Sequence, residues 1–206
     1  MIQLTLVDPK LDLCNYWEEE FQEFPEVEVV CGYFESIKDF DCMVSAANSF
    51  GLMDGGVDLA IINFFGEELE KRVQRYIIEN YFGEQPVGTS FLIDTKNEKH
   101  PFIAHTPTMR TPMAITGTDY VYLAMKAILE IVWKHNTADS SQKIEKILCP
   151  GLGTATGRMP PKEAARQMKL AYKNFKSPPQ SIDWRYAAKR QQEIKYGGNL
   201  GHKFSR

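Results

Sequence analysis

The chain has 206 residues, of which 43% are hydrophobic and 25% charged, a composition typical of one folded domain with an extension. Its 24 basic and 27 acidic residues give a formal net charge of −3, which lacks the broad basic face needed for general nucleic-acid binding. No apolar run approaches the roughly 20 residues that span a bilayer, and the N-terminal segment lacks the layout of a signal peptide. We therefore expect no membrane binding and a cytoplasmic location.

The first part of the chain predicts three strands and one helix. Residues 2–7 alternate and are rich in β-forming side chains, which predicts a strand that stops before Pro9. Apolar side chains recur at helical spacing over 11–24, which predicts a short amphipathic helix. Two further apolar runs, 27–34 and 42–47, predict strands.

The middle of the chain changes to a helical period after its first pair of glycines. The apolar residues between 56 and 81 predict a helical stretch, which Gly66 divides into two helices. Residues 86–93 and 102–105 predict two more strands. Residues 119–135 predict a helix that is buried along most of its girth.

The last part of the chain predicts a strand, a helix and an extension. Residues 144–149 form the strand, and Pro160-Pro161 open the helix, because proline fits a first helical turn. We expect the domain to cover 1–176 and a basic extension to cover 177–206, with a helix near 183–194 and a mobile tail. Strands that alternate with helices indicate an α/β sandwich with its sheet covered on both faces.

The four cysteines stand far apart, with no CxxC pair and no histidine at metal-ligand spacing. This pattern predicts no bound metal, and we expect no cofactor. Cys31, Cys42 and Cys149 lie in or beside apolar runs, so we expect them to be buried, reduced thiols.

Two segments join a predicted strand to a predicted helix through glycines, VSAANSFGLMDGGVDLAI at 44–61 and LCPGLGTATGRMPPKEA at 148–164. Glycines let consecutive backbone N–H groups converge on an anion, and a helix N-terminus adds partial positive charge. A P-loop is excluded because GxxxxGK[ST] is absent, and the later glycines do not match GxGxxG. Either turn alone is more often a plain connection, but together they indicate a site for a diphosphate.

Residues 41–66, which read DCMVSAAN, SFGLM and DGGVDLAI, resemble the first signature of the macro domain family, and the later GLGTATGRMP resembles its second loop. PFIAHTPT occupies the place of the family's intervening strand, and the resemblance spans about residues 1–176. It implies a three-layer α/β/α sandwich with a central mixed sheet. It also implies binding of ADP-ribose or an ADP-ribosylated protein, and many members hydrolyse such compounds.

The resemblance assigns candidate roles to individual positions. Asn48 matches the asparagine at the distal ribose, and Asp58 matches an acidic residue that orients water or the ribose, so these are the candidate catalytic residues. The remaining matched positions line the two diphosphate loops: Gly55, Gly56 and Val57 in the first, and Gly153, Thr154, Ala155, Thr156 and Gly157 in the second.

The chain departs from the family at the position that binds adenine. The family's Asp, which accepts a hydrogen bond from the adenine amino group, is replaced by Tyr33. Tyr33 could contact a base or pack in the core. Asp39 or Asp41, which are close in sequence, are alternative acceptors.

Four further positions carry open alternatives. Ser45 replaces the family's first asparagine, and Asp54 replaces its first loop glycine, where the carboxylate would repel phosphates unless it caps the helix. Arg158 could pair with a phosphate or be solvated. His105, at a strand end, could be a proton carrier at the rim or make a structural hydrogen bond.

The leading hypothesis is a module that binds ADP-ribose or a closely related NAD-derived nucleotide. It would hydrolyse a bond at the distal ribose, as in removal of ADP-ribose from proteins, without a metal. Asn48 would position the ribose hydroxyls, and Asp58 or a phosphate-held water would act as the base. The alternatives are a non-catalytic ADP-ribose-binding module and a pocket altered for another phosphorylated metabolite.

Overall fold

The computed structural model describes residues 2–138 and 142–194. Its centre is a six-stranded sheet in the order β2-β1-β6-β3-β5-β4. All neighbouring strands are parallel except β4, which runs antiparallel to β5. The strands are β1 (Gln3–Asp8), β2 (Val27–Cys31), β3 (Cys42–Asn48), β4 (Phe91–Asp94), β5 (Phe102–Met109) and β6 (Lys146–Pro150).

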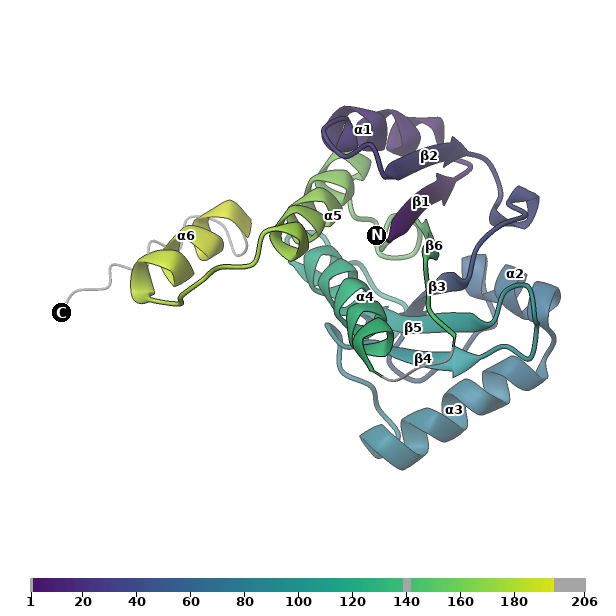
Figure 1. Ribbon diagram of the computed structural model, residues 1–206. Coiled ribbons are helices and arrows are strands. Elements are labelled where there is room, and N and C mark those ends of the chain that lie inside the picture. Colours follow the sequence, from purple (N-terminus) through teal and green to yellow (C-terminus); the bar gives the residue numbers. More distant parts are fainter. Residues whose placement is uncertain (1, 139–141, 195–206) are drawn as a thin grey trace.

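Helices cover both faces of the sheet (Figure 1). One layer holds α1 (Leu11–Phe21), α4 (Tyr120–Thr137) and α5 (Pro161–Lys176), and the other holds α2 (Gly56–Phe65) and α3 (Glu68–Tyr81). The predicted three-layer α/β/α sandwich with a mixed sheet is confirmed.

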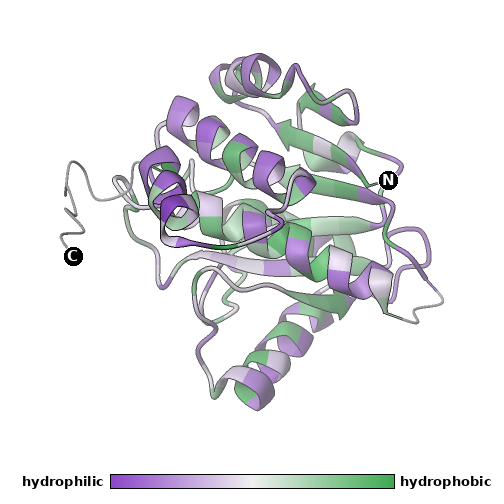
Figure 2. Ribbon diagram, turned by 60° about the vertical axis from the view of Figure 1, so that its left-hand side comes forward, coloured by the Kyte–Doolittle hydropathy of each residue, from purple (hydrophilic) through white to green (hydrophobic). Residues whose placement is uncertain are grey.

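Alternate residues of the central strands pack in the two core layers, because successive side chains of a strand point to opposite faces of the sheet. Ile147 and Cys149 of β6 pack under α4 and α5, whereas Leu148 between them packs under α2 and α3. A strand that is buried on both faces is apolar throughout, which is why these runs were recognisable as strands. Figure 2 shows the hydrophobic strands enclosed by helices that carry both hydrophobic and hydrophilic residues.

Most predicted elements are present, and the differences lie at their ends. The strand predicted over 27–34 stops at Cys31, because the next residues turn into a short 3-10 helix, η1 (Phe34–Ser36). The strand predicted over 86–93 is only β4, because Pro86 lies in a turn in which its carbonyl accepts a hydrogen bond from Thr89. β5 extends beyond the predicted 102–105 because its last residues continue to pair with β3.

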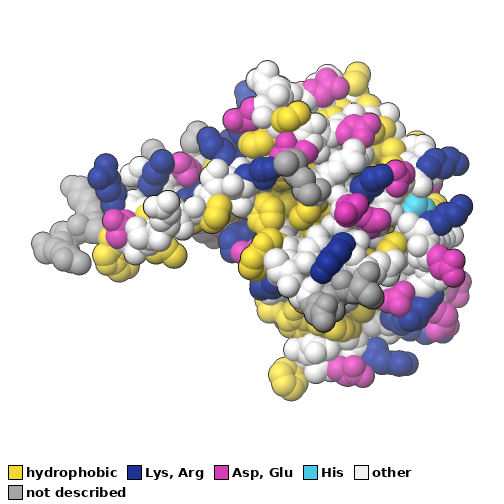
Figure 3. Space-filling view, viewed as in Figure 1, with side chains coloured by type: hydrophobic (Ala, Val, Ile, Leu, Met, Phe, Trp, Pro, Cys, Tyr) yellow, Lys and Arg dark blue, Asp and Glu magenta, His cyan; other side chains and the backbone are white. Residues whose placement is uncertain are grey.

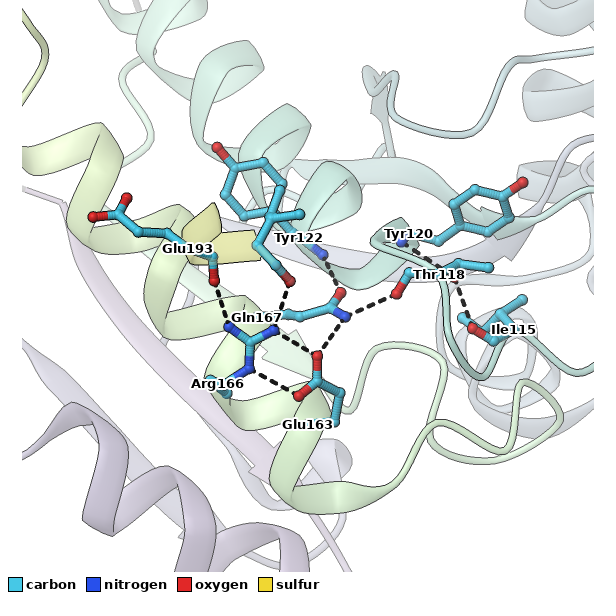
Figure 4. Close-up of polar contacts among 9 residues, drawn as sticks. Ile115, Thr118, Tyr120, Tyr122, Glu163, Arg166, Gln167 and Glu193 are labelled. Carbon is cyan, nitrogen blue, oxygen red and sulfur yellow. Dashed lines mark hydrogen bonds and ion pairs between the residues drawn. The ribbon is translucent and has the colours of Figure 1, made fainter. Parts of the chain in front are cut away.

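The extension contains α6 (Trp184–Ile194), which lies outside α5, away from the sheet (Figure 1). No described residue of α6 is buried. The Arg166 guanidinium on α5 donates hydrogen bonds to the carbonyls of Glu193 and Ile194, both at 2.9 Å, and it also pairs with Glu163 (Figure 4). The predicted tail beyond residue 194 lies outside the described residues.

Two observations bear on the predictions from composition. Cys42 and Cys149 are buried, but Cys31 is exposed, so the prediction that it is buried is wrong; it ends β2, an edge strand with a single neighbour. None of the helices in the described ranges is long and apolar enough to cross a membrane.

Candidate functional site

A hollow of about 170 Å³ lies where β3, β5 and β6 end at their carboxyl ends, the edge at which open α/β sheets hold ligands. We call it the first hollow. Both glycine turns contribute to it, through residues 54–58 before and within α2 and residues 151–157 after β6. The two turns therefore face one another across a single space, as expected from the sequence.

Backbone amides of both turns are available to an anion. Among the described residues, the amides of 54–58 and of 153–157 donate no hydrogen bond to one another or to the rest of the chain. Gly56 and Gly153 have positive φ values of 58° and 67°, which other residues rarely adopt. The first helical turn of any α-helix leaves its amides without helical partners. α2 begins at Gly56, inside the first of the two glycine turns.

Asp58 lies in the first turn of α2 and lines the first hollow, with only 6% of its surface exposed. Ser45 on β3 donates a hydrogen bond from its hydroxyl to the Asp58 carboxylate at 2.8 Å. Burial raises the pKa of Asp58 to about 7, the Ser45 hydrogen bond opposes this rise, and the charge of Glu70 adds to it. Ser45, which departs from the family pattern, is therefore a partner of the candidate base.

Asn48 ends β3 and also lines the first hollow, but its side chain is engaged within its own loop. Its Nδ2 donates to the Leu52 carbonyl at 2.7 Å, and its Oδ1 accepts from the amides of Phe50 and Leu52 at 3.0 and 3.3 Å. Leu52 lines the same hollow. Asn48 thus shapes the wall of the hollow through the turn that it closes.

Asp54 is exposed at the first hollow and does not cap α2. The N-cap of that helix is Gly55, and within the described part of the chain no side chain caps it, so the suggestion that Asp54 caps α2 is wrong. Because Asp54 is exposed, solvent and salt screen its charge, which reduces the repulsion of a phosphate in the first hollow.

A second hollow of about 280 Å³ adjoins the first. The two share lining residues from both glycine turns: Gly56, Val57, Gly151 and Ala155. Its outer wall consists of residues 7–10, which join β1 to α1, and residues 32–35, which follow β2. The two hollows therefore adjoin at residues of both glycine turns.

Tyr33 lines the second hollow and is 70% exposed, so it does not pack in the core. Asp39 and Asp41 do not reach this hollow. Asp39 pairs with Lys146, and Asp41 accepts hydrogen bonds from the amides of Glu145 and Lys146, at the start of β6 and thus at the opposite edge of the sheet. The hypothesis that either aspartate replaces the family's adenine acceptor is therefore wrong.

The carboxylates that do line the second hollow are Asp8 and Glu35. One oxygen of Asp8 accepts a hydrogen bond from the Lys10 amide at 2.9 Å, and the other lies 2.5 Å from where a side-chain carbon of residue 151 would be. Thr154 Oγ1 and Leu13 Cδ2 lie 2.7 and 2.8 Å from the same point, so a larger residue at 151 would require these three side chains to move. A signal for Asp8 was present in the sequence, because Asp8 lies where a predicted strand is followed by a predicted helix, as both glycine turns do.

The cation beside the second turn is Lys10, whose Nζ donates to the Thr154 carbonyl at 3.3 Å. Lys10 lines the second hollow, whereas Arg158 is exposed and is not part of the lining of either hollow. Thr154 and Thr156 line the second and first hollow respectively.

His105 is fully buried in β5, so it is not a proton carrier at the rim. Its Nδ1 lies 2.7 Å from the Gln85 side-chain oxygen, which confirms the alternative of a structural hydrogen bond. Burial lowers the pKa of His105 to about 3, so the ring is neutral. Within the described ranges, no three His, Cys, Asp or Glu side chains are grouped so that they could hold a metal ion.

The model of the Macro domain family matches residues 44–168, which hold both glycine turns and the first hollow's lining. The chain belongs to the macro domain family. The chain is 32% identical over 151 residues to an uncharacterised protein of Aquifex aeolicus, over 73% of this chain and 82% of that protein. Residues 1–43, which supply the outer wall of the second hollow, precede the family match.

Solved macrodomain structures share the fold. The Oceanobacillus iheyensis macrodomain with ADP has a TM-score of 0.58 at 22% identity, covering 80% of this chain and 87% of that chain. The Trypanosoma brucei macrodomain in complex with ADP-ribose has a TM-score of 0.52 at 18% identity, covering 84% of this chain and 57% of that chain.

Proposed function

We propose that this macro domain binds ADP-ribose along the two joined hollows. The diphosphate lies between the glycine turns, the distal ribose occupies the first hollow, and the adenosine occupies the second. The observation that carries the proposal is that two glycine turns with free amides line the first hollow together, and that the second hollow adjoins the first at these same turns. The macrodomain in complex with ADP-ribose among the similar structures supports it.

The second hollow offers groups that suit an adenine. Tyr33 presents an exposed aromatic ring, on which a base can stack. The free oxygen of Asp8 and the carboxylate of Glu35 can accept hydrogen bonds from an exocyclic amino group, which is a donor. Lys10 supplies positive charge beside the second turn, where the diphosphate would otherwise meet mostly backbone.

Calorimetric titration of the full chain with ADP-ribose tests this proposal. We expect saturable binding by the natural sequence and none by the Gly55→Glu variant. Gly55 has extended backbone and nothing within 4 Å of an added side-chain carbon, so a glutamate there leaves the fold intact while it fills the first hollow with negative charge. Absence of heat with ADP-ribose at millimolar concentration would overturn the proposal, and binding of another phosphorylated metabolite in its place would favour an altered pocket.

A second, finer function is hydrolysis of the bond between the distal ribose and a protein side chain. It is favoured by Asp58, a carboxylate with a pKa of about 7 in the wall of the proposed ribose site. In this reaction Asp58 takes a proton from a water whose oxygen attacks the anomeric carbon. The bond from that carbon to the protein side chain breaks, and the proton held by Asp58 passes to the leaving side chain. A base of that pKa suits neutral pH.

Release of ADP-ribose from an ADP-ribosylated protein tests the hydrolytic role. We expect Asp58→Asn to remove release while ADP-ribose binding persists, because the asparagine can still accept the Ser45 hydrogen bond. Ser45→Ala should shift the acidic limb of the pH–rate profile to higher pH, because that hydrogen bond lowers the pKa of Asp58. Binding without release by the natural sequence would leave the non-catalytic module as the function.

A further inference from the structure

Two of the four cysteines, from different elements, lie next to Asp8 and Gly32, which line the second hollow. Cys14 lies on α1 and Cys31 ends β2, where it pairs in register with Asp8 of β1. The Cys14 thiol donates to the Asp8 carbonyl at 3.1 Å, and the same carbonyl accepts the Gly32 amide at 3.1 Å. One oxygen therefore joins Cys14 to the residue that follows Cys31. Because strand residues alternate between the two faces, Cys31 lies on the face of β2 that carries Val27 and Val29, which pack in the core layer of α1, so both thiols lie on the α1 side of the sheet.

The two thiols differ in access to solvent. Cys31 is exposed, whereas Cys14 is only 2% exposed. Burial raises the pKa of Cys14 to about 12, and Cys31 and the charge of Asp8 contribute to the rise. Cys42 and Cys149 are fully buried on the central strands β3 and β6. Because oxidation of a thiol follows its exposure and thiolate content, Cys31 is the first thiol that an oxidant meets.

We propose that Cys14 and Cys31 form a site of oxidative modification, at which a peroxide converts the two thiols into an intramolecular disulfide. The Cys31 sulfur attacks hydrogen peroxide, breaks the O–O bond and becomes a sulfenic acid, with release of one water. The Cys14 sulfur then attacks the Cys31 sulfur, forms the S–S bond and releases the second water. The peroxide gains the two electrons and two protons that the thiols lose.

The modification acts on the wall of the second hollow. Once Cys14 is in a disulfide, it has no hydrogen to donate to the Asp8 carbonyl, and Asp8 and Gly32 both line that hollow. This part rests on the proposed function: because Asp8 and Gly32 would contact the ligand, we expect the oxidised chain to bind ADP-ribose less tightly than the reduced chain does. Formation of the disulfide does not depend on ligand binding and is measured separately.

The test treats the folded full chain with hydrogen peroxide, blocks the remaining thiols with iodoacetamide, and maps non-reduced peptides by mass spectrometry. We expect one cross-linked peptide pair that contains Cys14 and Cys31 and disappears on treatment with dithiothreitol. Cys42 and Cys149 should be alkylated only after unfolding, and the Cys42→Ser variant should behave as the natural sequence does.

The single variants separate the two steps. Cys14→Ser keeps a donor for the Asp8 carbonyl and should stop the reaction at a Cys31 sulfenic acid, which dimedone traps. Cys31→Ser should leave Cys14 reduced. A Cys31 that accumulates as sulfenic acid or links to a second chain in the natural sequence, with Cys14 still a free thiol, would overturn the proposal. Disulfide formation with unchanged ADP-ribose affinity would refute only the effect on the second hollow, and a chain that binds no ADP-ribose would refute only the proposed function.

Discussion

Asp58 combines two properties that rarely occur together in a carboxylate, namely burial and a place in the wall of a hollow. The Ser45 hydroxyl donates a hydrogen bond to it, whereas Glu70 adds like charge. The family resemblance identified Asp58 but not this environment, because burial depends on which strand lies beneath α2. At the scale of the residue, the resemblance predicted that Asp58 belongs to the candidate site, but it could not predict the burial and the hydrogen bond that set the pKa of Asp58.

We expect Asp58 to make the folded state less stable as pH rises. Its pKa is about 7 in the folded chain, against an ordinary value of 3.8, so between these values the folded chain holds a proton that the unfolded chain has lost. The resulting stability is present at low pH and is lost as pH rises to about 7. Between about pH 5 and about pH 8 the loss should be on the order of 3 kcal/mol.

Urea denaturation of the natural sequence and of Asp58→Asn at the two pH values measures this effect. The difference in unfolding free energy between the two proteins should change with pH by that amount, since other carboxylates contribute equally to both. A difference that does not vary with pH would contradict the raised pKa.

Lys10 and Arg158 provide a matched pair of basic residues near the second turn. Lys10 lines the second hollow and contacts the Thr154 carbonyl, whereas Arg158 is exposed and lines neither hollow. We expect Lys10→Ala to weaken ADP-ribose binding about tenfold, as loss of a charge-assisted contact to a phosphate does. Arg158→Ala should change binding much less, and a titration of both variants in which Arg158→Ala has the larger effect would contradict this assignment.

At the scale of the elements, hydrophobic periodicity predicted nearly every helix and strand, because both sheet faces are covered and the strands are apolar throughout. What periodicity could not give is the order of the strands. Asp39 and Asp41 are close to the first signature in sequence, but they precede β3 and lie at its opposite end from the hollows. Asp8 is distant in sequence, yet it reaches the second hollow because β1 lies beside β6.

α6 shows how an element can be attached through few contacts. Figure 3 shows Lys and Arg side chains gathered on this helix, which has no buried residue among those described. The Arg166 guanidinium donates hydrogen bonds to carbonyls at the C-terminal end of α6, where a helix leaves backbone acceptors without helical partners (Figure 4). Glu163 orients this guanidinium, and Ile194 adds an apolar contact with the core layer of α5, so the attachment combines the guanidinium with hydrophobic packing at the end of the helix.

We expect Arg166→Ala to release α6 while the sandwich stays folded. Backbone amides of 184–194 should exchange with deuterium faster in this variant, and trypsin should cleave there sooner. Arg190→Ala is the control, because Arg190 contacts Tyr186 and Glu193 within α6 itself. Equal exchange in α6 of Arg166→Ala and the natural sequence would show that other contacts hold the helix.

At the scale of the molecule, both hollows lie at the carboxyl ends of parallel strands and draw their walls from segments far apart in the chain. A ligand that bridges them contacts the first and second turns together, and such a ligand binds only the folded state. We therefore expect ADP-ribose at about 100 times its dissociation constant to raise the free energy of unfolding by about 2.7 kcal/mol.

Differential scanning calorimetry measures this effect as a rise in melting temperature that increases with ADP-ribose concentration. Gly55→Glu should melt close to the natural sequence without ligand and should show no rise with it, because its backbone is extended and its added side chain has space. Gly56 is a poorer choice for this control, since its positive φ would strain any other residue. A concentration-dependent rise in Gly55→Glu would contradict the place given to the diphosphate.

The position of β1 between β2 and β6 also governs how the chain reaches its fold during synthesis. Gln3 pairs with Lys146, so β1 waits for a partner strand that is translated only after β2, β3, β4 and β5. Until then the free edge of β1 presents unpaired backbone N–H and C=O groups, with which a strand of another chain can pair. Nascent chains of this protein are accordingly exposed to aggregation for longer than a fold built from sequential neighbours, and should depend more on chaperones at the ribosome exit.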